Sequence, residues 1–426
     1  MKVETPVRMQ LLEEMVRGLS REPDPDAAAH RYIDAMQEAY GPQALIFLAL
    51  RDGGYVITRF IDQTGEKVID SRDLWDGDVD APVHAEGVLG QVTKDGKAKL
   101  ITNLDVGGDS VLGDALQEYR TLMALPIFGE GEVRHWLILL HPDASRFDDA
   151  DLENNLLRAN TMTSLVVQKR LNQELQRALG WIRDEVDQIA MVQRSLLPKA
   201  MPEIPGHDIA ARWETYDRAG GDYYDFLRWQ LPEVGDERWT WIVADASGHG
   251  PASAVLVAML HVLLRALPAP VGGPAALLRQ MNERLFDCPT CTNFMTAFVG
   301  CYRPERRELA YALAGHHPPL LRRASGRVER LAVDPAVPLG VIDHVEAPMA
   351  SIRLEPGDVL LLYTDGLVDA HGPDDEVFGE ARLGEALAEA QGTAQEIVDL
   401  IFDRVAAHEA GRRPTDDKTA VVVRVE

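Results

Sequence analysis

The chain has 426 residues, of which 46% are hydrophobic, and this length and composition suit two or three globular domains. Acidic residues outnumber basic ones by 68 to 43, which gives a formal net charge of −25. Such a surface repels nucleic acids and anionic membranes, so neither is an expected partner. The N-terminus lacks the charge layout of a secretory signal, and no apolar run approaches the length of a membrane span. We therefore expect a cytoplasmic protein.

Residues 1–165 are predicted to form an α+β domain. Helical periodicity over 7–19 and 27–40 is followed by strands over 44–50 and 55–60, a helix over 87–94, a strand over 98–102, and a hairpin of 122–128 with 133–140. This order, together with Gly87-Val88-Leu89-Gly90 and Leu125-Pro126-Ile127, resembles a GAF sensory domain. The resemblance implies an input signal such as a small-molecule ligand. A GAF-like domain that only dimerises is the alternative.

A long helix is predicted to follow, from about residue 148 to 197. Apolar residues recur in it on alternating four- and three-residue steps, with Glu185 as the one polar occupant: Leu171, Leu175, Ala178, Ile182, Ile189, Val192 and Leu196. This heptad seam predicts that residues 166–198 form a parallel coiled coil linking two copies of the chain. A single helix packed on its own N-terminal domain is the alternative. Gly180 is a candidate flex point.

In the C-terminal region, four apolar strands each begin or end at an aspartate. The segments are 218–226 with Asp222, 241–251 with Asp245, 357–367 with Asp365, and 415–423 with Asp416 and Asp417. Any one such aspartate more often forms a turn or caps a helix. Four of them at buried strand ends would be costly without compensation, which indicates cations. Oxygen ligands alone favour Mg²⁺ or Mn²⁺ over Zn²⁺.

Five motifs in order identify the family that this region resembles. They are Gly-Gly-Asp-Tyr-Tyr-Asp, Val-Ala-Asp-Ala-Ser-Gly-His-Gly, Ala-Gly-His-His-Pro-Pro, Tyr-Thr-Asp-Gly and Asp-Asp-Lys-Thr. Their order resembles the SpoIIE-like branch of the PPM metal-dependent serine/threonine protein phosphatases, over residues 205–426. The resemblance implies a β-sandwich flanked by helices, over a domain of residues 199–426. Helices are expected at 252–264, 273–287, 379–390 and 394–408, and an antiparallel hairpin of 309–314 with 320–323.

The resemblance also implies the site residues. Asp245 and the backbone carbonyl of Ala246 would bridge two divalent cations, Mn²⁺ or Mg²⁺, and Asp222, Asp365 and Asp416 would complete the site. Asp417 could replace Asp416 as a ligand or support the site by hydrogen bonds. A water held between the cations would attack phosphorus in line, so no protein nucleophile is needed.

The roles of several neighbouring residues stay open from sequence. Asp225 is as suited to supporting the site as to a structural role at the strand edge. His249 fits a turn better than a proton donor, and the adjacent histidines 316 and 317 fit a backbone turn better than a metal site. Cys288 and Cys291 have the spacing of half a zinc site, but no second Cys/His pair lies nearby, so packing cysteines are expected.

The expected fold class is α+β multidomain: a GAF-like sensor, a coiled-coil linker helix and a PPM-type α-β-β-α sandwich. The expected function is a signal-regulated, metal-dependent protein serine/threonine phosphatase. In this branch the implied substrate is a phosphorylated STAS-domain antagonist of an anti-sigma factor in a bacterial partner-switching pathway. The alternatives are a non-catalytic partner-binding module of the same fold and a hydrolase of small phosphate esters.

Overall fold

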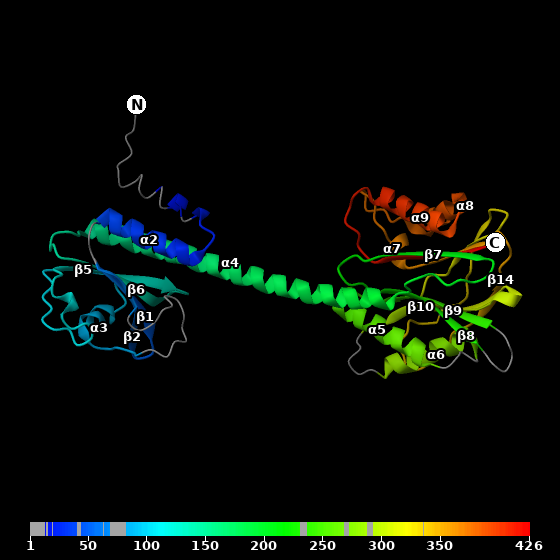
Figure 1. Ribbon diagram of the computed structural model, residues 1–426, viewed down its shortest axis with the longest axis horizontal. Coiled ribbons are helices and arrows are strands. Elements are labelled where there is room, and N and C mark those ends of the chain that lie inside the picture. Colours follow the sequence, from blue (N-terminus) through cyan, green and yellow to red (C-terminus); the bar gives the residue numbers. More distant parts are fainter. Residues whose placement is uncertain are drawn as a thin grey trace, which may run out of the picture. The chain divides into compact units, whose positions relative to one another are not determined.

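In a computed structural model the chain divides into two compact units, Met1–Leu179 and Gly180–Glu426 (Figure 1). The structure describes residues 13, 16–18, 20–40, 44–62, 64–68, 82–230, 237–267, 272–287, 293–334 and 336–426. The predicted helix over 7–19 lies largely outside these residues, and the pair Cys288 and Cys291 lies wholly outside them. The domain boundaries predicted at 165 and 198 stay predictions. No helix in the described part of the chain is both long enough and apolar enough to cross a bilayer.

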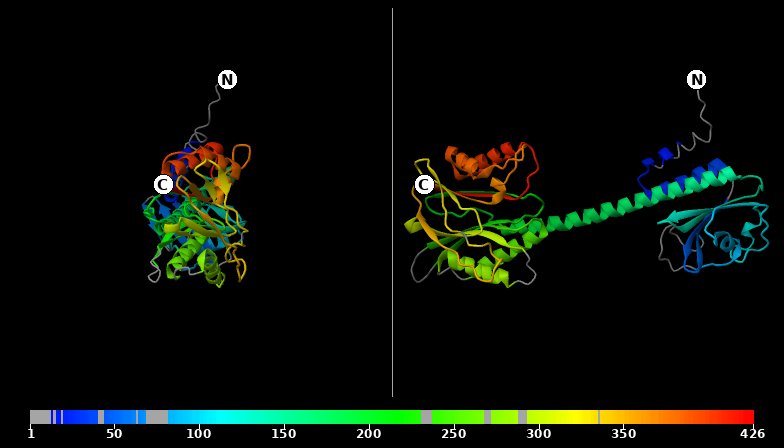
Figure 2. Two further views of the ribbon diagram at one scale, coloured as in Figure 1. Left: turned by 90° about the vertical axis from the view of Figure 1, so that its right-hand side faces the viewer. Right: turned by 180° about the vertical axis from the view of Figure 1, so that it is seen from behind.

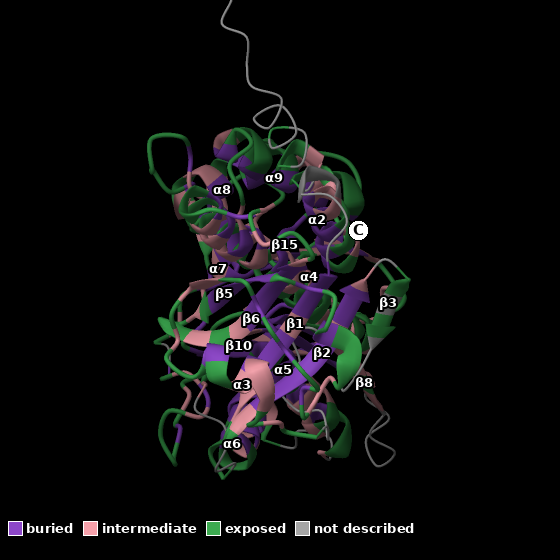
Figure 3. Ribbon diagram, turned by 90° about the vertical axis from the view of Figure 1, so that its left-hand side faces the viewer, coloured by how far each residue is buried: buried purple, intermediate pink, exposed green. Residues whose placement is uncertain are grey.

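The first unit is a six-stranded antiparallel sheet with helices on both faces. Its strand order is β3-β2-β1-β6-β5-β4, so β1 and β6 lie in the middle, where their buried residues show in Figure 3. The helix α2 and the first part of α4 pack on one face, and α3 packs on the other. The elements are α2 (Pro25–Tyr40), β1 (Ala44–Arg51), β2 (Gly54–Asp62), β3 (Gly65–Val68), α3 (Gly87–Thr93), β4 (Lys99–Thr102), β5 (Thr121–Gly129), β6 (Glu132–His141) and α4 (Asp149–Leu196).

The second unit is a sandwich of two antiparallel five-stranded sheets, with orders β14-β11-β10-β9-β8 and β13-β12-β15-β16-β7. Helices α5 and α6 cover the outer face of the first sheet, and α7, α8 and α9 cover that of the second (Figure 2). The strands are β7 (His207–Glu214), β8 (Asp222–Gln230), β9 (Glu237–Ala246), β10 (Met295–Arg303), β11 (Glu308–Ala314), β12 (Leu320–Arg322), β13 (Val328–Arg330), β14 (Ala350–Arg353), β15 (Val359–Tyr363) and β16 (Lys418–Val425). The helices are α5 (Pro251–Ala266), α6 (Gly273–Phe286), α7 (Asp365–Val368), α8 (Gly379–Glu389) and α9 (Ala394–Glu409).

The last strand shows why the apolar runs of this unit are continuous. Side chains alternate between the two faces of a strand. In β16, Val421 and Val423 point into the core between the sheets, whereas Ala420 and Val422 pack under the outer helices. Both faces are buried there, so apolar residues occupy every position from Ala420 to Val423 and the usual polar alternation is lost over this stretch.

The predicted hairpin of 309–314 with 320–323 is wrong. Strand β11 pairs with β10 and β14, whereas β12 pairs with β13 and β15 in the other sheet. The five residues between them, 315–319, cross from one sheet to the other. Pro318 and Pro319 have no backbone N–H for a hairpin ladder, and Gly315 adopts a positive φ of 65° at the start of the crossing.

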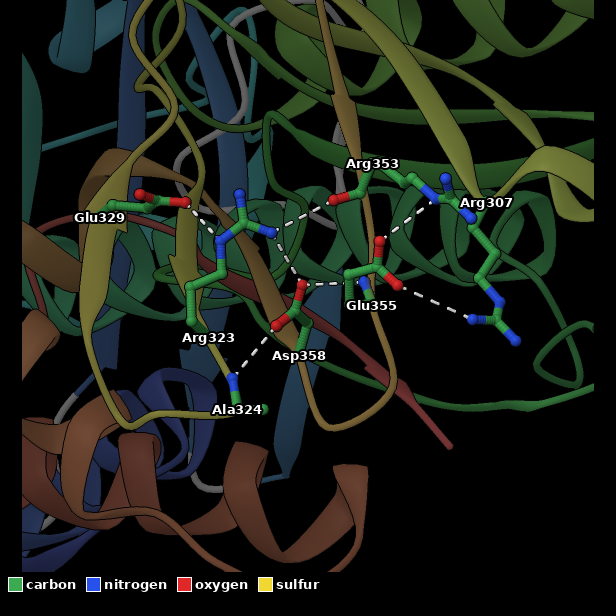
Figure 4. Close-up of polar contacts among 7 residues, drawn as sticks. All are labelled: Arg307, Arg323, Ala324, Glu329, Arg353, Glu355 and Asp358. Atoms are coloured by element: carbon green, nitrogen blue, oxygen red, sulfur yellow. Dashed lines mark hydrogen bonds and ion pairs between the residues drawn. The ribbon is translucent and has the colours of Figure 1, made fainter.

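At the start of β15, a buried aspartate ties the loop between β12 and β13 to the loop between β14 and β15 (Figure 4). Asp358 is 1% exposed and accepts hydrogen bonds from the Arg323 guanidinium at 2.9 Å and from the backbone N–H groups of Ala324 at 3.1 Å and Glu355 at 2.9 Å. These donors satisfy the carboxylate, so its burial is tolerated.

Removal of this carboxylate is expected to destabilise the second unit. Asp358→Ala leaves the two backbone donors without an acceptor and removes one of three partners of the Arg323 guanidinium, which also bonds Glu329 and the Arg353 carbonyl, at a cost of roughly 2 to 3 kcal/mol. The matched control is Arg353→Ala, because that side chain is 69% exposed and pairs with Glu355, which is itself exposed, so the change should cost less than about 0.5 kcal/mol. Urea unfolding followed by tryptophan fluorescence measures both. Equal midpoints for the two variants would contradict the role given to Asp358.

Candidate metal centre

One edge of the sandwich gathers the aspartates that the sequence singled out. In the first sheet, Asp222 opens β8 and lies opposite Asp245 near the end of β9. In the second sheet, β15 ends just before Asp365, and β16 begins just after Asp416 and Asp417. Strands β15 and β16 are antiparallel partners, so the end of one and the start of the other lie at the same edge. The structure therefore brings the predicted carboxylates to one place from four strands.

Asp222 connects the two sheets at this edge. Its side chain is 1% exposed, and Oδ2 accepts hydrogen bonds from the hydroxyls of Thr364 at 2.7 Å and Thr419 at 2.6 Å. The pKa of this carboxyl is raised well above its ordinary value, first by burial and then by the charges of Asp245 and Asp417. Sequence reasoning gave no role to the two threonines, although both lie within the Thr-Asp-Gly and Asp-Asp-Lys-Thr motifs.

Asp245 lies among the other carboxylates. Burial raises its pKa to about 8, together with the negative charges of Asp365, Asp416 and Asp417. Burial and the neighbouring Asp416 likewise raise the pKa of Asp365. Several carboxylates that raise one another's pKa form a site of concentrated negative charge, which a divalent cation would stabilise.

A backbone carbonyl also reaches this site. A Cβ atom placed on Gly221 would lie 2.4 Å from the carbonyl oxygen of Ala246 and 3.1 Å from Oδ1 of Asp245. A side chain at position 221 would clash with the Ala246 carbonyl, so glycine lets the loop before β8 pass close to both oxygens. Oxygen donors of this kind suit Mg²⁺ or Mn²⁺. Within the described residues, however, no three Asp, Glu, His or Cys side chains as they stand are arranged to hold a metal ion.

The adjacent aspartates 416 and 417 have different environments. Asp417 is 1% exposed and accepts hydrogen bonds from the backbone N–H groups of Tyr216 at 2.7 Å and Gly221 at 2.5 Å. Asp416 is half-buried, and its Oδ1 accepts the N–H of Asp417 at 2.9 Å. The carboxylate of Asp417 is thus bonded to the backbone of the loop before β8, whereas that of Asp416 is bonded to the residue that follows it. Besides burial, the charges of both residues raise the pKa of Asp245, and the charge of Asp416 also raises the pKa of Asp365.

Asp225 lies away from this cluster. Three residues after Asp222 on the same strand, it belongs to the opposite face of the sheet. Its carboxylate accepts hydrogen bonds from the Tyr223 hydroxyl at 2.6 Å and from Arg265 of α5 at 2.8 Å. The sequence left two roles open for Asp225, support of the metal site or a structural role at the strand edge. Its bonds to Tyr223 and Arg265 match the structural role.

The candidate histidines also have structural surroundings. The ring of His249 is exposed and packs edge-on against Tyr216, with 5.6 Å between the ring centroids. His316 is buried, its Nδ1 lies 2.8 Å from the Thr296 hydroxyl, and burial lowers its pKa to about 3, so the ring is neutral. The His317 ring lies 5.8 Å from that of Tyr363.

One residue of the long helix reaches the loop that precedes β8. Gln193 of α4 is 2% exposed, and its amide group makes two hydrogen bonds with Gly220: Nε2 donates to the carbonyl at 2.5 Å, and Oε1 accepts the N–H at 3.0 Å. Gly220 directly precedes Gly221 and Asp222. No function was predicted for Gln193 from the sequence.

Comparisons with known proteins show what this chain is similar to. The profile of the Stage II sporulation protein E (SpoIIE) family matches residues 235–426. Protein IcfG of Synechocystis sp. is 25% identical to this chain over 71% of the chain and 54% of IcfG. Phosphoserine phosphatase RsbU of Bacillus subtilis is 25% identical over 52% of the chain and 64% of RsbU. The chain thus spans between half and two thirds of these relatives. The SiaA-PP2C domain of Pseudomonas aeruginosa superposes with a TM-score of 0.51 at 23% identity, over 58% of this chain and 99% of that one, which shows a PP2C-like fold.

Proposed function

We propose that the second unit is a metal-dependent protein serine/threonine phosphatase of the SpoIIE family, whose profile matches residues 235–426. The observation that carries the proposal is the group of aspartates at one sandwich edge, where burial and mutual repulsion raise the pKa of Asp245 to about 8. The similarity to a phosphoserine phosphatase supports the same reaction. Phosphate release from a phosphorylated protein in the presence of Mn²⁺ tests the proposal.

Each residue of the edge has a proposed task. Asp245 and the carbonyl of Ala246 would bridge two Mn²⁺ or Mg²⁺ ions, with Asp222, Asp365 and Asp416 as further ligands. The hydrogen bonds of Asp417 to Tyr216 and Gly221 favour a supporting role for that residue over a ligand role. When bound, the two cations would supply a water of lowered pKa and neutralise the phosphate oxygens.

The residues around the ligands would keep these positions fixed. The Thr364 and Thr419 hydroxyls hold Oδ2 of Asp222, which orients its other oxygen. A Cβ on Gly366 would lie 1.8 Å from the Asp417 carbonyl oxygen, so glycine there lets Asp365 approach the segment that carries Asp416. A preorganised set of charges of this kind reduces the reorganisation needed during the reaction.

The proposed substrate is a phosphorylated STAS-domain protein of a partner-switching pathway. The similarity to the phosphoserine phosphatase RsbU supports a phosphoserine on the substrate, and the STAS-domain class is part of the proposal. Two other functions make different predictions. A non-catalytic binding module would release no phosphate from any substrate, and a hydrolase of small phosphate esters would cleave p-nitrophenyl phosphate but no phosphoprotein.

We further propose that the first unit is a GAF-like sensor that acts through α4. The six-stranded antiparallel sheet with helices on both faces supports a GAF-like fold. Along α4, the seam residues Leu171, Leu175 and Ile182 are 61%, 54% and 50% exposed. A stripe of exposed apolar residues in one helix supports a homodimer through a coiled coil over 166–198.

The C-terminal part of the heptad seam, in the last turns of α4, supports a regulatory role for this helix. Ile189 packs beside Ala219 and Ala254, and Leu196 packs against the core under α5, so this part of the helix is packed within the second unit, which begins at Gly180. Rotation of the helix in a coiled coil would alter these contacts and the bonds from Gln193 to Gly220. A truncated chain starting near residue 202 with the full rate and metal affinity would rule out this mechanism.

Gln193→Ala is expected to weaken metal binding by about tenfold, because loss of the two bonds to Gly220 loosens the loop that carries Gly221 and Asp222. The matched control is Gln176→Ala in the same helix, where the side chain is exposed. Phosphate release as a function of Mn²⁺ concentration measures the effect. Identical Mn²⁺ dependence in the two variants would show that Gln193 does not position the site.

A further inference from the structure

A loop between β13 and β14 lies along the same sandwich edge as the carboxylates. Leu339 exchanges two backbone hydrogen bonds with Met295, of 3.0 and 2.8 Å, and the N–H of Gly315 donates to the Ala336 carbonyl at 2.7 Å. In the sheet, Met295 is the partner of Ala246, and the next residue is the partner of Asp245. The loop is therefore fixed beside the candidate metal centre.

Large apolar side chains are exposed on this loop and just before β10; one of them, Met349, lies at the end of the loop next to β14, and the other four lie near the paired residues Leu339 and Met295. The exposed fractions are 43% for Phe294, 42% for Val337, 48% for Val341 and 42% for Ile342. We call these four residues the apolar platform. Single exposed apolar residues are ordinary on a protein surface, but several of them gathered beside a candidate active site indicate an interaction surface.

A buried amide holds one side of the apolar platform in place. Asn282 of α6 is fully buried; its Nδ2 donates to the carbonyls of Ile342 at 2.9 Å and Asp343 at 3.2 Å, and its Oδ1 accepts the N–H of Gly340 at 2.9 Å. A buried polar side chain is costly unless it is bonded, and here every bond goes to this loop. The exposed side chains of Val341 and Ile342 are consequently preorganised.

Phe294 is held relative to Asp245 in a similar way. Ser247, two residues after Asp245, donates its N–H to the Phe294 carbonyl at 2.8 Å, and its Oγ accepts the Phe294 N–H at 3.0 Å. Asn293 adds a bond from Nδ2 to the Ser247 carbonyl at 3.1 Å. The platform and the carboxylates thus share one rigid edge.

We propose that the apolar platform is the docking surface for the phosphoprotein substrate, which contacts it with apolar residues next to its phosphorylated side chain; this rests on the proposed phosphatase function. Electrostatics alone do not favour such a partner, because a phosphorylated protein brings negative charge to a chain of net charge −25. Burial of apolar surface supplies attraction that does not depend on charge. A small phosphate ester carries no groups that reach the platform.

The test compares two substrates on the full-length chain with Mn²⁺: a phosphorylated STAS-domain protein and p-nitrophenyl phosphate. Ile342→Asp and Val341→Asp are expected to lower kcat/KM for the phosphoprotein by about 10- to 100-fold and to leave hydrolysis of the small ester unchanged. If an aspartate unfolds the loop, Ile342→Ser is the milder substitution, and it should show a smaller loss on the phosphoprotein and none on the small ester. Val262→Asp is the matched control, because this valine is 63% exposed on α5 and lies outside the platform.

The outcomes separate this inference from the proposed function. Unchanged phosphoprotein turnover in the platform variants would overturn the docking surface while the phosphatase assignment stands. An equal loss on both substrates would also overturn it, because the loop would then support the metal centre. A wild-type chain that hydrolyses neither substrate would overturn the proposed function and the docking surface together.

Discussion

Asp245→Asn is expected to lower phosphate release from a phosphorylated STAS-domain protein by at least about 10³-fold in the presence of Mn²⁺. As the proposed bridging ligand, this carboxylate would contact both cations, so its loss weakens both at once. Metal ions supply several kcal/mol of charge stabilisation in such reactions, and each 1.36 kcal/mol corresponds to a factor of ten in rate. The measurement is steady-state phosphate release by the full-length chain over a range of Mn²⁺ concentrations.

Asp225→Asn is the matched control for this experiment. It is the same chemical change on the neighbouring strand, but its carboxylate faces Arg265 and Tyr223 on the other side of the sheet. We expect this variant to keep its Mn²⁺ dependence. If Asp245→Asn retained more than a tenth of the wild-type rate, Asp245 would not be a bridging ligand. No release by the wild type would favour the non-catalytic binding module.

The elements that carry the site were predictable because their signals are local. Strands such as β15 and β16 are apolar runs bounded by Asp-Gly or Asp-Asp, and α5 begins at Pro251 after a glycine turn. The structure places helices α5, α6, α8 and α9 within about two residues of the predicted ranges. Local patterns fix where an element begins and which residue lies at its end.

The pairing of elements was less predictable. An apolar strand, a five-residue connection and another apolar strand satisfy the pattern of a hairpin and of a crossing between sheets equally well, which is why β11 and β12 were wrongly paired. The roles of Thr364 and Thr419 depend on contacts with Asp222 across 142 and 197 residues of sequence. No local signal indicates such contacts.

Adjacent residues with the same chemistry are also indistinguishable in sequence. Asp416 and Asp417 differ only in which way each side chain points, and this depends on where the loop of Tyr216 and Gly221 passes. The heptad seam is a related case. Its spacing predicts that Ile189 faces a partner helix, but in the structure this residue packs beside Ala219 of the second unit. Periodicity predicts a buried stripe without indicating what buries it.

Without metal, stability is expected to fall as the pH rises, and Asp245→Asn should remove part of this fall. The folded-state pKa of Asp245, about 8, lies above the ordinary value of 3.8. Between pH 4 and pH 8 the folded chain therefore holds a proton that the unfolded chain has released, so raising the pH favours unfolding. Asparagine does not ionise, and we expect the variant to be more stable than the wild type by roughly 2 kcal/mol at pH 8 in EDTA.

Thermal unfolding in EDTA at pH 5, 6, 7 and 8 measures this difference. The Tm of Asp245→Asn should exceed that of the wild type by an amount that grows to roughly 4 to 8 °C at pH 8. Saturating Mn²⁺ should reverse the order, because a bound cation stabilises the wild-type carboxylate and adds binding free energy only to the folded chain. A Tm difference that is constant from pH 5 to pH 8 would mean that Asp245 ionises normally in the folded chain. Asp245→Asn therefore tests two effects of one carboxylate. Without metal, the carboxylate destabilises the folded chain; with metal, it would hold the cations on which the proposed activity depends.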